Sequence, residues 1–157
     1  MTSLTEGSPA PDFTLPTDSG QDFTLSAQRG HPVVLFFYPA DDTEGCTVEN
    51  IEFTQLKPEY DAIGAQLLGI SPDSVEAHCK FRDKYSLAAP LAADTERKVI
   101  EAYGVWGDKK NFGHEYEGLI RTTFLIAPDG TIAKIWPVTR IKAHAVEALE
   151  AAKQLVT

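Results

Sequence analysis

Residues 33–47 read VVLFFYPADDTEGCT, and this stretch decides the fold. Its first five residues are apolar on both faces of a strand, which is typical of a central strand covered by helices on both sides. Apolar positions then recur at helical spacing from Cys46 to about Ile63. The sequence therefore places a cysteine where a buried strand ends and a helix begins, with the Thr43 hydroxyl three residues upstream.

Strands and helices alternate along the rest of the chain. Residues 8–25 carry alternating apolar residues around the turn DSG at 18–20, which predicts a short N-terminal β-hairpin. Pro58 predicts a kink or a break in the helix that follows Cys46. Later elements are predicted as a strand over 66–71, a helix over 74–86 capped by Ser74, a short strand over 89–93, a short helix over 96–103, a hairpin of 121–127 with 131–138, and a helix over 142–156. This is an α/β order without an internal repeat, and we expect one domain over residues 1–157.

Composition excludes several classes of partner. The chain has 157 residues, 43% of them hydrophobic, and a net charge of −9, which argues against nucleic acid or an anionic membrane surface because phosphate binding needs a basic face. The first residues show no secretory signal, and the apolar runs are too short to span a bilayer. Two cysteines, Cys46 and Cys79, in such a chain indicate a reducing compartment. We therefore expect a cytoplasmic protein.

Cys46 has two interpretations. A lone buried cysteine is often a small apolar filler, but at a helix N-terminus the backbone amides and the helix dipole favour the thiolate and can bring a cysteine pKa to about 3.5–7.5. A fall in pKa from about 8.5 to about 6 raises the thiolate fraction at pH 7 roughly thirtyfold, and the accompanying loss of nucleophilicity gives back roughly tenfold. Because only a few-fold gain remains, a fast thiol enzyme must stabilise its transition state through groups around the sulfur.

The motif Pro39-x-x-x-Thr43-x-x-Cys46 resembles the active-site signature of the peroxiredoxins. Residues 38–49, YPADDTEGCTVE, are similar in particular to the bacterioferritin comigratory protein (PrxQ) subfamily. The resemblance covers nearly the whole chain, through PDF at 11–13, LGIS at 68–71, YGVWG at 103–107 and GLIRTTFLI at 118–126. It implies a thioredoxin-like fold, with a central mixed sheet flanked by helices, and an enzyme that reduces hydrogen peroxide and organic hydroperoxides.

The same resemblance implies a role for each residue of the motif. Cys46 would be the peroxidatic cysteine, which attacks the distal peroxide oxygen and becomes a sulfenic acid. Thr43 would hold the peroxide, Pro39 would shield the sulfur from water, and Arg121 would supply a cation. Without the motif, Arg121 would be interpreted as a surface arginine, but a fixed guanidinium stabilises both a thiolate and the charge on the leaving oxygen. Glu49 is a candidate partner that would hold Arg121 in place.

The resolving step would depend on Cys79. Subfamily members carry a resolving cysteine either five residues after the peroxidatic one, where this chain has Ile51, or on the next helix, where it has Arg82. Cys79 precedes Arg82 by one turn, at the edge of the predicted buried stripe. A disulfide needs Cα atoms within about 7 Å, so a bridge to Cys46 requires local unwinding around Cys46 or residues 74–84. We expect this intramolecular disulfide, reduced by thioredoxin or a similar dithiol donor; the alternative is a one-cysteine enzyme in which Cys79 fills the core.

Two other classes of function compete with a peroxidase. A thioredoxin-like disulfide oxidoreductase requires two cysteines separated by two residues, whereas TVEN follows Cys46. A non-catalytic interaction domain is the third class. We expect no metal and no nucleotide cofactor, because the histidines at 31, 78, 114 and 144 form no ligand spacing with either cysteine and no glycine pattern cradles a phosphate. The subfamily resemblance favours a monomer.

Other polar residues near the thiol are expected to be packed or solvated residues that take no part in the reaction. His78 lies on the apolar stripe of its predicted helix and is expected to be a packed, hydrogen-bonded residue. Four acids near the thiol are expected first to be solvated residues of a loop and a helix start, whose negative field would oppose a thiolate: Asp41, Asp42, Glu44 and Glu49.

Overall fold

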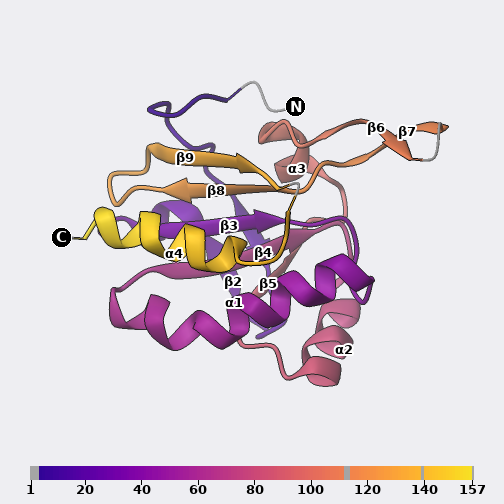
Figure 1. Cartoon of the computed structure of the whole chain (residues 1–157), viewed down its shortest axis with the longest axis horizontal. Helices are drawn as coiled ribbons and strands as arrows, with labels where there is room; N and C mark the ends of the chain where they lie inside the picture. Colours follow the sequence, from indigo (N-terminus) through magenta and orange to yellow (C-terminus); the bar gives the residue numbers. More distant parts are fainter. Residues whose placement is uncertain (1–3, 112–113, 139, 157) are drawn as a thin grey trace.

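A mixed β-sheet forms the centre of the protein (Figure 1). The computed structural model describes the backbone of residues 4–111, 114–138 and 140–156, and the side chains of these residues outside 108–116. The sheet has the order β5-β4-β3-β8-β9, made of Leu91–Ala93, Gln66–Ser71, Val33–Phe37, Thr122–Ile126 and Ile132–Pro137. Strands β3, β4 and β5 are parallel, whereas β8 is antiparallel to both β3 and β9. The predicted α/β fold with a mixed central sheet is confirmed.

Each face of the sheet has its own apolar core, because successive residues of a strand point to opposite faces. Val34 and Phe36 of β3 pack into one core with α1 (Glu44–Ala62), α2 (Val75–Tyr85) and α4 (His144–Gln154). Leu35 and Phe37 pack into the other core with α3 (Lys98–Ala102) and the N-terminal segment. Strand β3 is buried along its whole length, as its continuous apolar sequence predicts.

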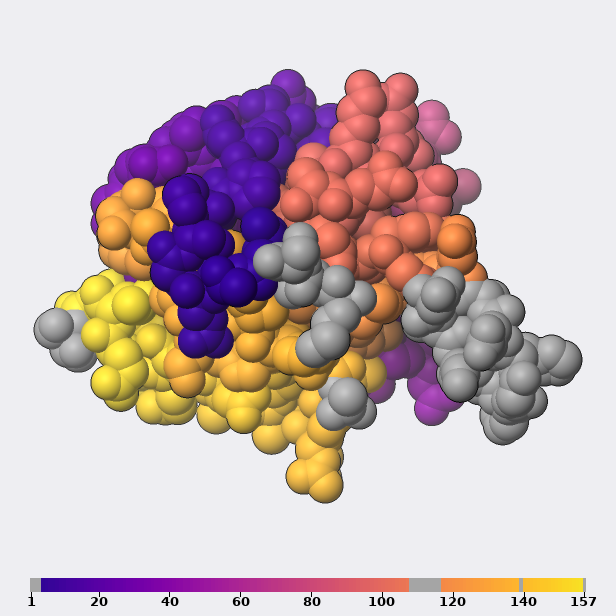
Figure 2. Space-filling view, turned by 90° about the horizontal axis from the view of Figure 1, so that it is seen from above, coloured from indigo at the N-terminus to yellow at the C-terminus, as the bar shows by residue number. Residues whose placement is uncertain are grey.

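The N-terminal segment covers the sheet on the α3 side. Strands β1 (Thr14–Pro16) and β2 (Asp22–Thr24) pair antiparallel, which confirms the predicted hairpin, and the 3-10 helix η1 (Leu25–Gln28) follows. Upstream, the Gly7 amide donates to the Ile132 carbonyl, and the Ile132 amide donates to the Ser8 carbonyl. Figure 2 shows this indigo segment lying against the orange residues of the β8–β9 region.

Helix α1 corrects one expectation. Of the kink or break predicted at Pro58, the break does not occur: α1 runs from Glu44 through Ala62 with Pro58 inside it. A proline in a helix lacks the amide that would bond the carbonyl four residues earlier. Pro58 is exposed, so water can hydrate that carbonyl, and Phe53 and Tyr60 are fully buried on either side and hold the helix to the core.

Helix α2 begins as the sequence predicts. The Ser74 hydroxyl accepts a hydrogen bond from the Ala77 amide at 3.1 Å, which satisfies one of the free donors of the first turn. His78 and Phe81 are the buried residues of this helix. Among the described residues, no helix is long and apolar enough to cross a membrane.

The hairpin of β6 (Trp106–Asn111) and β7 (His114–Leu119) was not expected from the sequence. Its strands read WGDKKN and HEYEGL, without a run of apolar residues. The hairpin extends away from the sheet (Figure 1). At its base Trp106 pairs with Leu119, which is buried. The apolar sequence pattern that predicts a buried strand is therefore missing here.

Candidate active site

Cys46 and Arg121 meet at one edge of the central sheet. The parallel strands β3, β4 and β5 all end at this edge, and ligands of open α/β sheets bind outside such carboxyl ends. Because β8 is antiparallel to β3 and Phe37 pairs with Thr122, β8 begins where β3 ends. This register places Arg121, the residue before β8, beside the loop that leads from β3 to Cys46.

Helix α1 begins two residues before Cys46, with Thr43 as its N-cap residue. Cys46 therefore lies in the first helical turn, where the backbone amides have no carbonyl partner within the helix. Its side chain is buried. The Thr43 hydroxyl does not cap the helix and instead donates a hydrogen bond to the Ala40 carbonyl at 2.9 Å. This bond fixes the hydroxyl and leaves its oxygen lone pairs available as acceptors.

Arg121 bridges Cys46 and Glu49. Its Nη2 donates to the Cys46 sulfur at 3.1 Å, and its Nη1 donates to Glu49 Oε1 at 2.6 Å. Cys46 and Glu49 lie on successive positions of one face of α1, since residues three apart in a helix are neighbours. The planar fork of the guanidinium thus reaches the sulfur and the carboxylate at the same time.

Burial sets the electrostatics of the Arg121–Glu49 pair. Burial raises the pKa of Glu49 to about 7, against the opposing effect of the Arg121 charge. Glu49 Oε2 is buried and has no hydrogen-bond partner among the described groups. For Arg121, burial works toward a lower pKa, but the charges of Glu49 and Cys46 outweigh it and raise the Arg121 pKa above its ordinary value. The guanidinium therefore stays charged beside the sulfur.

Two residues of the site were not expected from the sequence. The Asn50 side-chain amide donates to the Cys46 carbonyl at 3.0 Å, and the spacing of four residues in a helix could have indicated this contact. Ile141, in the loop before α4, lies against Gly45, where an added Cβ would come within 3.0 Å of Ile141 Cδ1 and 3.4 Å of Arg121 Nη2. Gly45 thus allows this loop and the guanidinium to approach the start of α1.

The acids near the thiol do not all lie in solvent as expected, and Glu49 is buried. Asp42 and Glu44 are exposed, but the Asp41 side chain is only 6% exposed. Its carboxylate accepts a hydrogen bond from the Tyr38 hydroxyl at 2.6 Å and lies 2.7 Å from Nδ1 of the fully buried His78. Asp41 is withdrawn from solvent because these two polar partners replace its hydration. Pro39 is half-buried in the same loop.

Cys79 faces away from this site. Its thiol is half-buried on α2 and lies 3.4 Å from the Asp18 carbonyl, which also accepts a bond from Arg82 at 2.7 Å. Cys46 and Cys79 are both free thiols. The structure thus brings together Cys46, Glu49 and Arg121, whereas Cys79 contacts the turn of the N-terminal hairpin.

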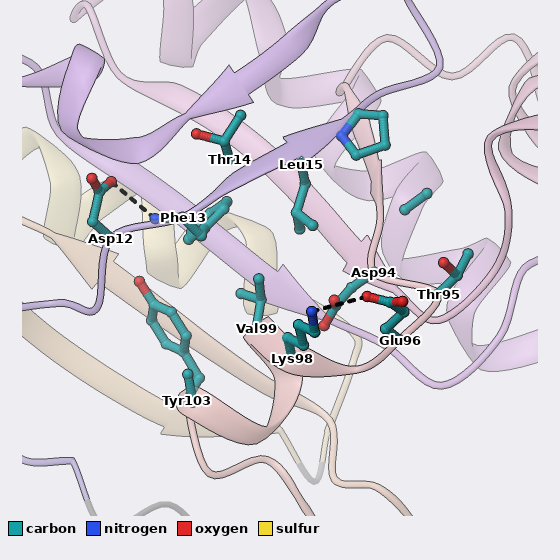
Figure 3. Close-up of a pocket in the computed structure, with 13 residues that line it drawn as sticks. Asp12, Phe13, Thr14, Leu15, Asp94, Thr95, Glu96, Lys98, Val99 and Tyr103 are labelled. Atoms are coloured by element: carbon teal, nitrogen blue, oxygen red, sulfur yellow. Dashed lines mark hydrogen bonds and ion pairs between the residues drawn. The ribbon is translucent and has the colours of Figure 1, made fainter.

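A hollow of about 550 Å³ lies on the α3 side of the sheet, between β1, the end of β5 and α3. Figure 3 shows Leu15 and Val99 pointing into it from opposite sides. Neither cysteine lines it, so it is separate from the thiol site. Among the described side chains, no group of three or more histidines, cysteines and acids is arranged to hold a metal ion. The side chain of His114 lies outside the described residues.

Comparison with known proteins gives the class of this chain. Residues 7–135 match the model of the AhpC/TSA family. Peroxiredoxin Bcp of Bacillus subtilis is 43% identical over 149 residues, which cover 95% of each chain. Peroxiredoxin Bcp of Xanthomonas campestris is 39% identical over 155 residues, covering 98% of this chain and 97% of the relative.

Solved structures agree with the sequence comparison. Peroxiredoxin Q of Xanthomonas campestris superposes with a TM-score of 0.88, at 36% identity and with 99% of both chains covered. The chain therefore belongs to the AhpC/TSA family. Within that family it is a peroxiredoxin of the Bcp (PrxQ) kind, and the thioredoxin-like fold that the sequence resemblance implies is confirmed.

Proposed function

We propose that this peroxiredoxin reduces hydrogen peroxide and organic hydroperoxides through Cys46, with Arg121, Thr43 and Pro39 as the other residues of the catalytic site. The observation that carries the proposal is the 3.1 Å contact between Arg121 Nη2 and the buried Cys46 sulfur at the start of α1. A cation and free helix amides around one sulfur stabilise negative charge there. That charge is what a peroxide-reducing thiol needs.

In the first step the Cys46 thiolate attacks the distal oxygen of the hydroperoxide. A sulfur–oxygen bond forms, the O–O bond breaks, and the electron pair leaves with the other oxygen as an alkoxide or hydroxide that takes a proton. Arg121 stabilises the charge as it moves from sulfur to the leaving oxygen. Thr43 Oγ1 accepts the hydrogen of the peroxide while it donates to Ala40. Cys46 becomes a sulfenic acid.

Glu49 and Pro39 support this step without reacting. The Glu49 carboxylate holds Arg121 Nη1, which leaves Nη2 directed at the sulfur. Pro39 has no amide hydrogen to compete for the peroxide and restricts the entry of water beside Cys46. Both residues thus hold the reacting groups in place.

Organic hydroperoxides belong among the proposed substrates. A structural study of the Xanthomonas campestris bacterioferritin comigratory protein, which superposes on this chain with a TM-score of 0.88 at 35% identity, concerns its alkyl peroxide reduction activity. The shared fold and the near-complete coverage of both chains support the same substrate class here.

The second step regenerates the thiol through Cys79. The Cys79 thiolate attacks the Cys46 sulfur, a disulfide forms, the S–O bond breaks, and the oxygen leaves as hydroxide, which takes a proton from solvent to become water. Cys79 must first leave its contact with the Asp18 carbonyl, so α2 has to open locally. Thioredoxin or a similar dithiol donor then reduces the disulfide to two thiols and becomes oxidised itself.

Mass spectrometry after one equivalent of hydrogen peroxide tests both steps. We expect a Cys46–Cys79 disulfide in the wild type, a sulfenic acid on Cys46 in Cys79→Ser, and no peroxide consumption in Cys46→Ser. Peroxide reduction that survives Cys46→Ser would refute the whole assignment. A lasting sulfenic acid in the wild type, with Cys79 still free, would make this a one-cysteine enzyme instead.

The remaining parts of the proposal concern the molecule as a whole. We infer a single catalytic domain over residues 1–157, acting as a monomer in the cytoplasm. Two cysteines in a chain whose first residues show no secretory signal support a reducing compartment. Light scattering of the reduced and the oxidised protein would test the monomer.

A further inference from the structure

The peroxidatic loop, residues 39–43, is held on its inner side by α2. His78 of α2 is fully buried, and its Nε2 lies 3.0 Å from the Ala92 carbonyl, so Nε2 carries the hydrogen of that bond. Its Nδ1 lies 2.7 Å from Asp41 Oδ2. Since the other oxygen of Asp41 accepts from Tyr38, the loop, the end of β3 and α2 share one buried polar cluster.

The loop is held a second time on its outer side. Asp42 has a φ of +58°, and its carboxylate projects to the last turn of α2. There it accepts hydrogen bonds from Lys84 Nζ at 2.7 Å and from the Tyr85 hydroxyl at 2.8 Å. Asp41 and Asp42, which are neighbours in the loop, are thus both held by contacts to α2.

Cys79 is the residue directly after His78 on that helix. A movement of α2 that frees Cys79 from Asp18 therefore also pulls on the Asp41 contact. The loop on the other side of that contact includes Thr43 and leads into the first turn of α1, where Cys46 lies. The two sets of contacts connect the surroundings of both thiols.

We infer that His78 with Asp41, and Lys84 and Tyr85 with Asp42, are positioning residues that form a brace between α2 and the peroxidatic loop. The brace keeps the loop in the geometry for peroxide attack and limits how often α2 opens to bring Cys79 to Cys46. This inference rests on the proposed function, because it assigns the brace a role in resolution by Cys79.

The brace predicts different effects on the two steps. Attack on peroxide needs the braced state. The rate of attack therefore stays almost unchanged as long as the braced state dominates the population. Disulfide formation needs the open state, and its rate follows the small open population. Weakening the brace should therefore accelerate disulfide formation while peroxide attack is nearly unaffected. A merely structural role of the same residues would slow both steps or neither.

Rapid-quench thiol labelling after one equivalent of peroxide measures the two steps in one experiment. His78→Gln removes the contact at Nδ1, and we expect disulfide formation to become about tenfold faster, because a buried hydrogen bond is lost. The double variant Lys84→Met with Tyr85→Phe removes an exposed ion pair and one hydroxyl bond, and we expect about a threefold increase. Peroxide attack should stay within about twofold in both.

Lys57→Met is the matched control, because it removes a Lys–Asp pair of 2.8 Å on the surface of α1 that does not touch the loop. Its rates should equal those of the wild type. The proposed role of the brace is refuted if the rate of disulfide formation is unchanged or lower in the folded variants. If His78→Gln does not fold, the double variant decides the question alone, because Lys84 is exposed and Tyr85→Phe keeps the ring that packs on Phe81.

The experiment distinguishes refutation of the brace from refutation of the proposed function. A wild type that forms no Cys46–Cys79 disulfide overturns resolution by Cys79, and with it the brace. A wild type that forms the disulfide, at a rate that the variants share, overturns the brace alone.

Discussion

Arg121 Nη2 lies 3.1 Å from the Cys46 sulfur, although 75 residues separate the two in the chain. The same guanidinium holds Glu49 through Nη1. The cation therefore cannot move away from the sulfur without breaking a buried ion pair, which is costly because it leaves an uncompensated charge. The position of the sulfur's cation is thus determined by a carboxylate on the same helix as the thiol.

Replacing Arg121 with lysine should slow peroxide attack by about 100-fold, the magnitude typical of losing one donor to a developing charge. An ammonium cannot reach the sulfur and Glu49 at once as the planar fork does. Stopped-flow measurement of Cys46 oxidation tests this. Arg29→Lys is the control, since Arg29 donates to the Asp129 carbonyl in a distant turn, and it should react like the wild type. Equal rates for the two variants would contradict a role for the fork.

Glu49→Gln should change how stability depends on pH. Burial raises the pKa of Glu49 from 4.5 to about 7 in the folded protein, against the pull of Arg121. The protonated carboxyl therefore favours the folded state below about pH 4.5, and this contribution is lost as the pH rises toward 7.

Glutamine resembles the protonated form at every pH. The variant should match the wild type near pH 4.5 and exceed it by on the order of 1–3 kcal/mol at pH 8, measured by urea unfolding. Glu59→Gln, at an exposed position of the same helix, is the control. A variant that is less stable than the wild type at pH 8 would show that the ion pair outweighs burial.

Gly45→Ala should slow peroxide attack by about tenfold, because its Cβ would come within 3.0 Å of Ile141 Cδ1 and 3.4 Å of Arg121 Nη2. Alanine in a helix otherwise stabilises by about 0.5–1 kcal/mol relative to glycine. Ile141→Val removes the Cδ1 atom, so the double variant should recover most of the rate. A double variant as slow as Gly45→Ala would show that Ile141 is not the obstacle.

Pro58→Ala should stabilise the protein. An internal proline costs a helix ~3 kcal/mol, whereas removing it gives the unfolded chain more freedom, worth ~1 kcal/mol in the opposite direction. We expect a net gain of ~2 kcal/mol in urea unfolding at unchanged peroxidase activity. No gain would mean that α1 already adapts to the proline without strain.

Much of the fold could be predicted from the sequence because its signals are local. The β3 strand is buried on both faces and reads as one apolar run, and Ser74 caps α2 as its position predicts. The β6–β7 hairpin, which extends from the sheet, could not be predicted in this way, because its sequence carries no apolar pattern. Sequence periodicity detects elements with one apolar face, so an element whose sequence lacks that pattern goes undetected.

The sequence by itself determined the thiol, its helix start and the family to which the chain belongs, because residues 38–49 form one continuous motif. Only the tertiary structure decided what surrounds that thiol. The antiparallel register of β3 and β8 places Arg121 at the sulfur, and burial gives Glu49 its raised pKa. The contact of Asp41 with His78 likewise joins the loop before α1 to helix α2, between residues 37 positions apart in the chain. These features depend on strand pairing and on the loss of water around charges, which no local pattern of residues encodes.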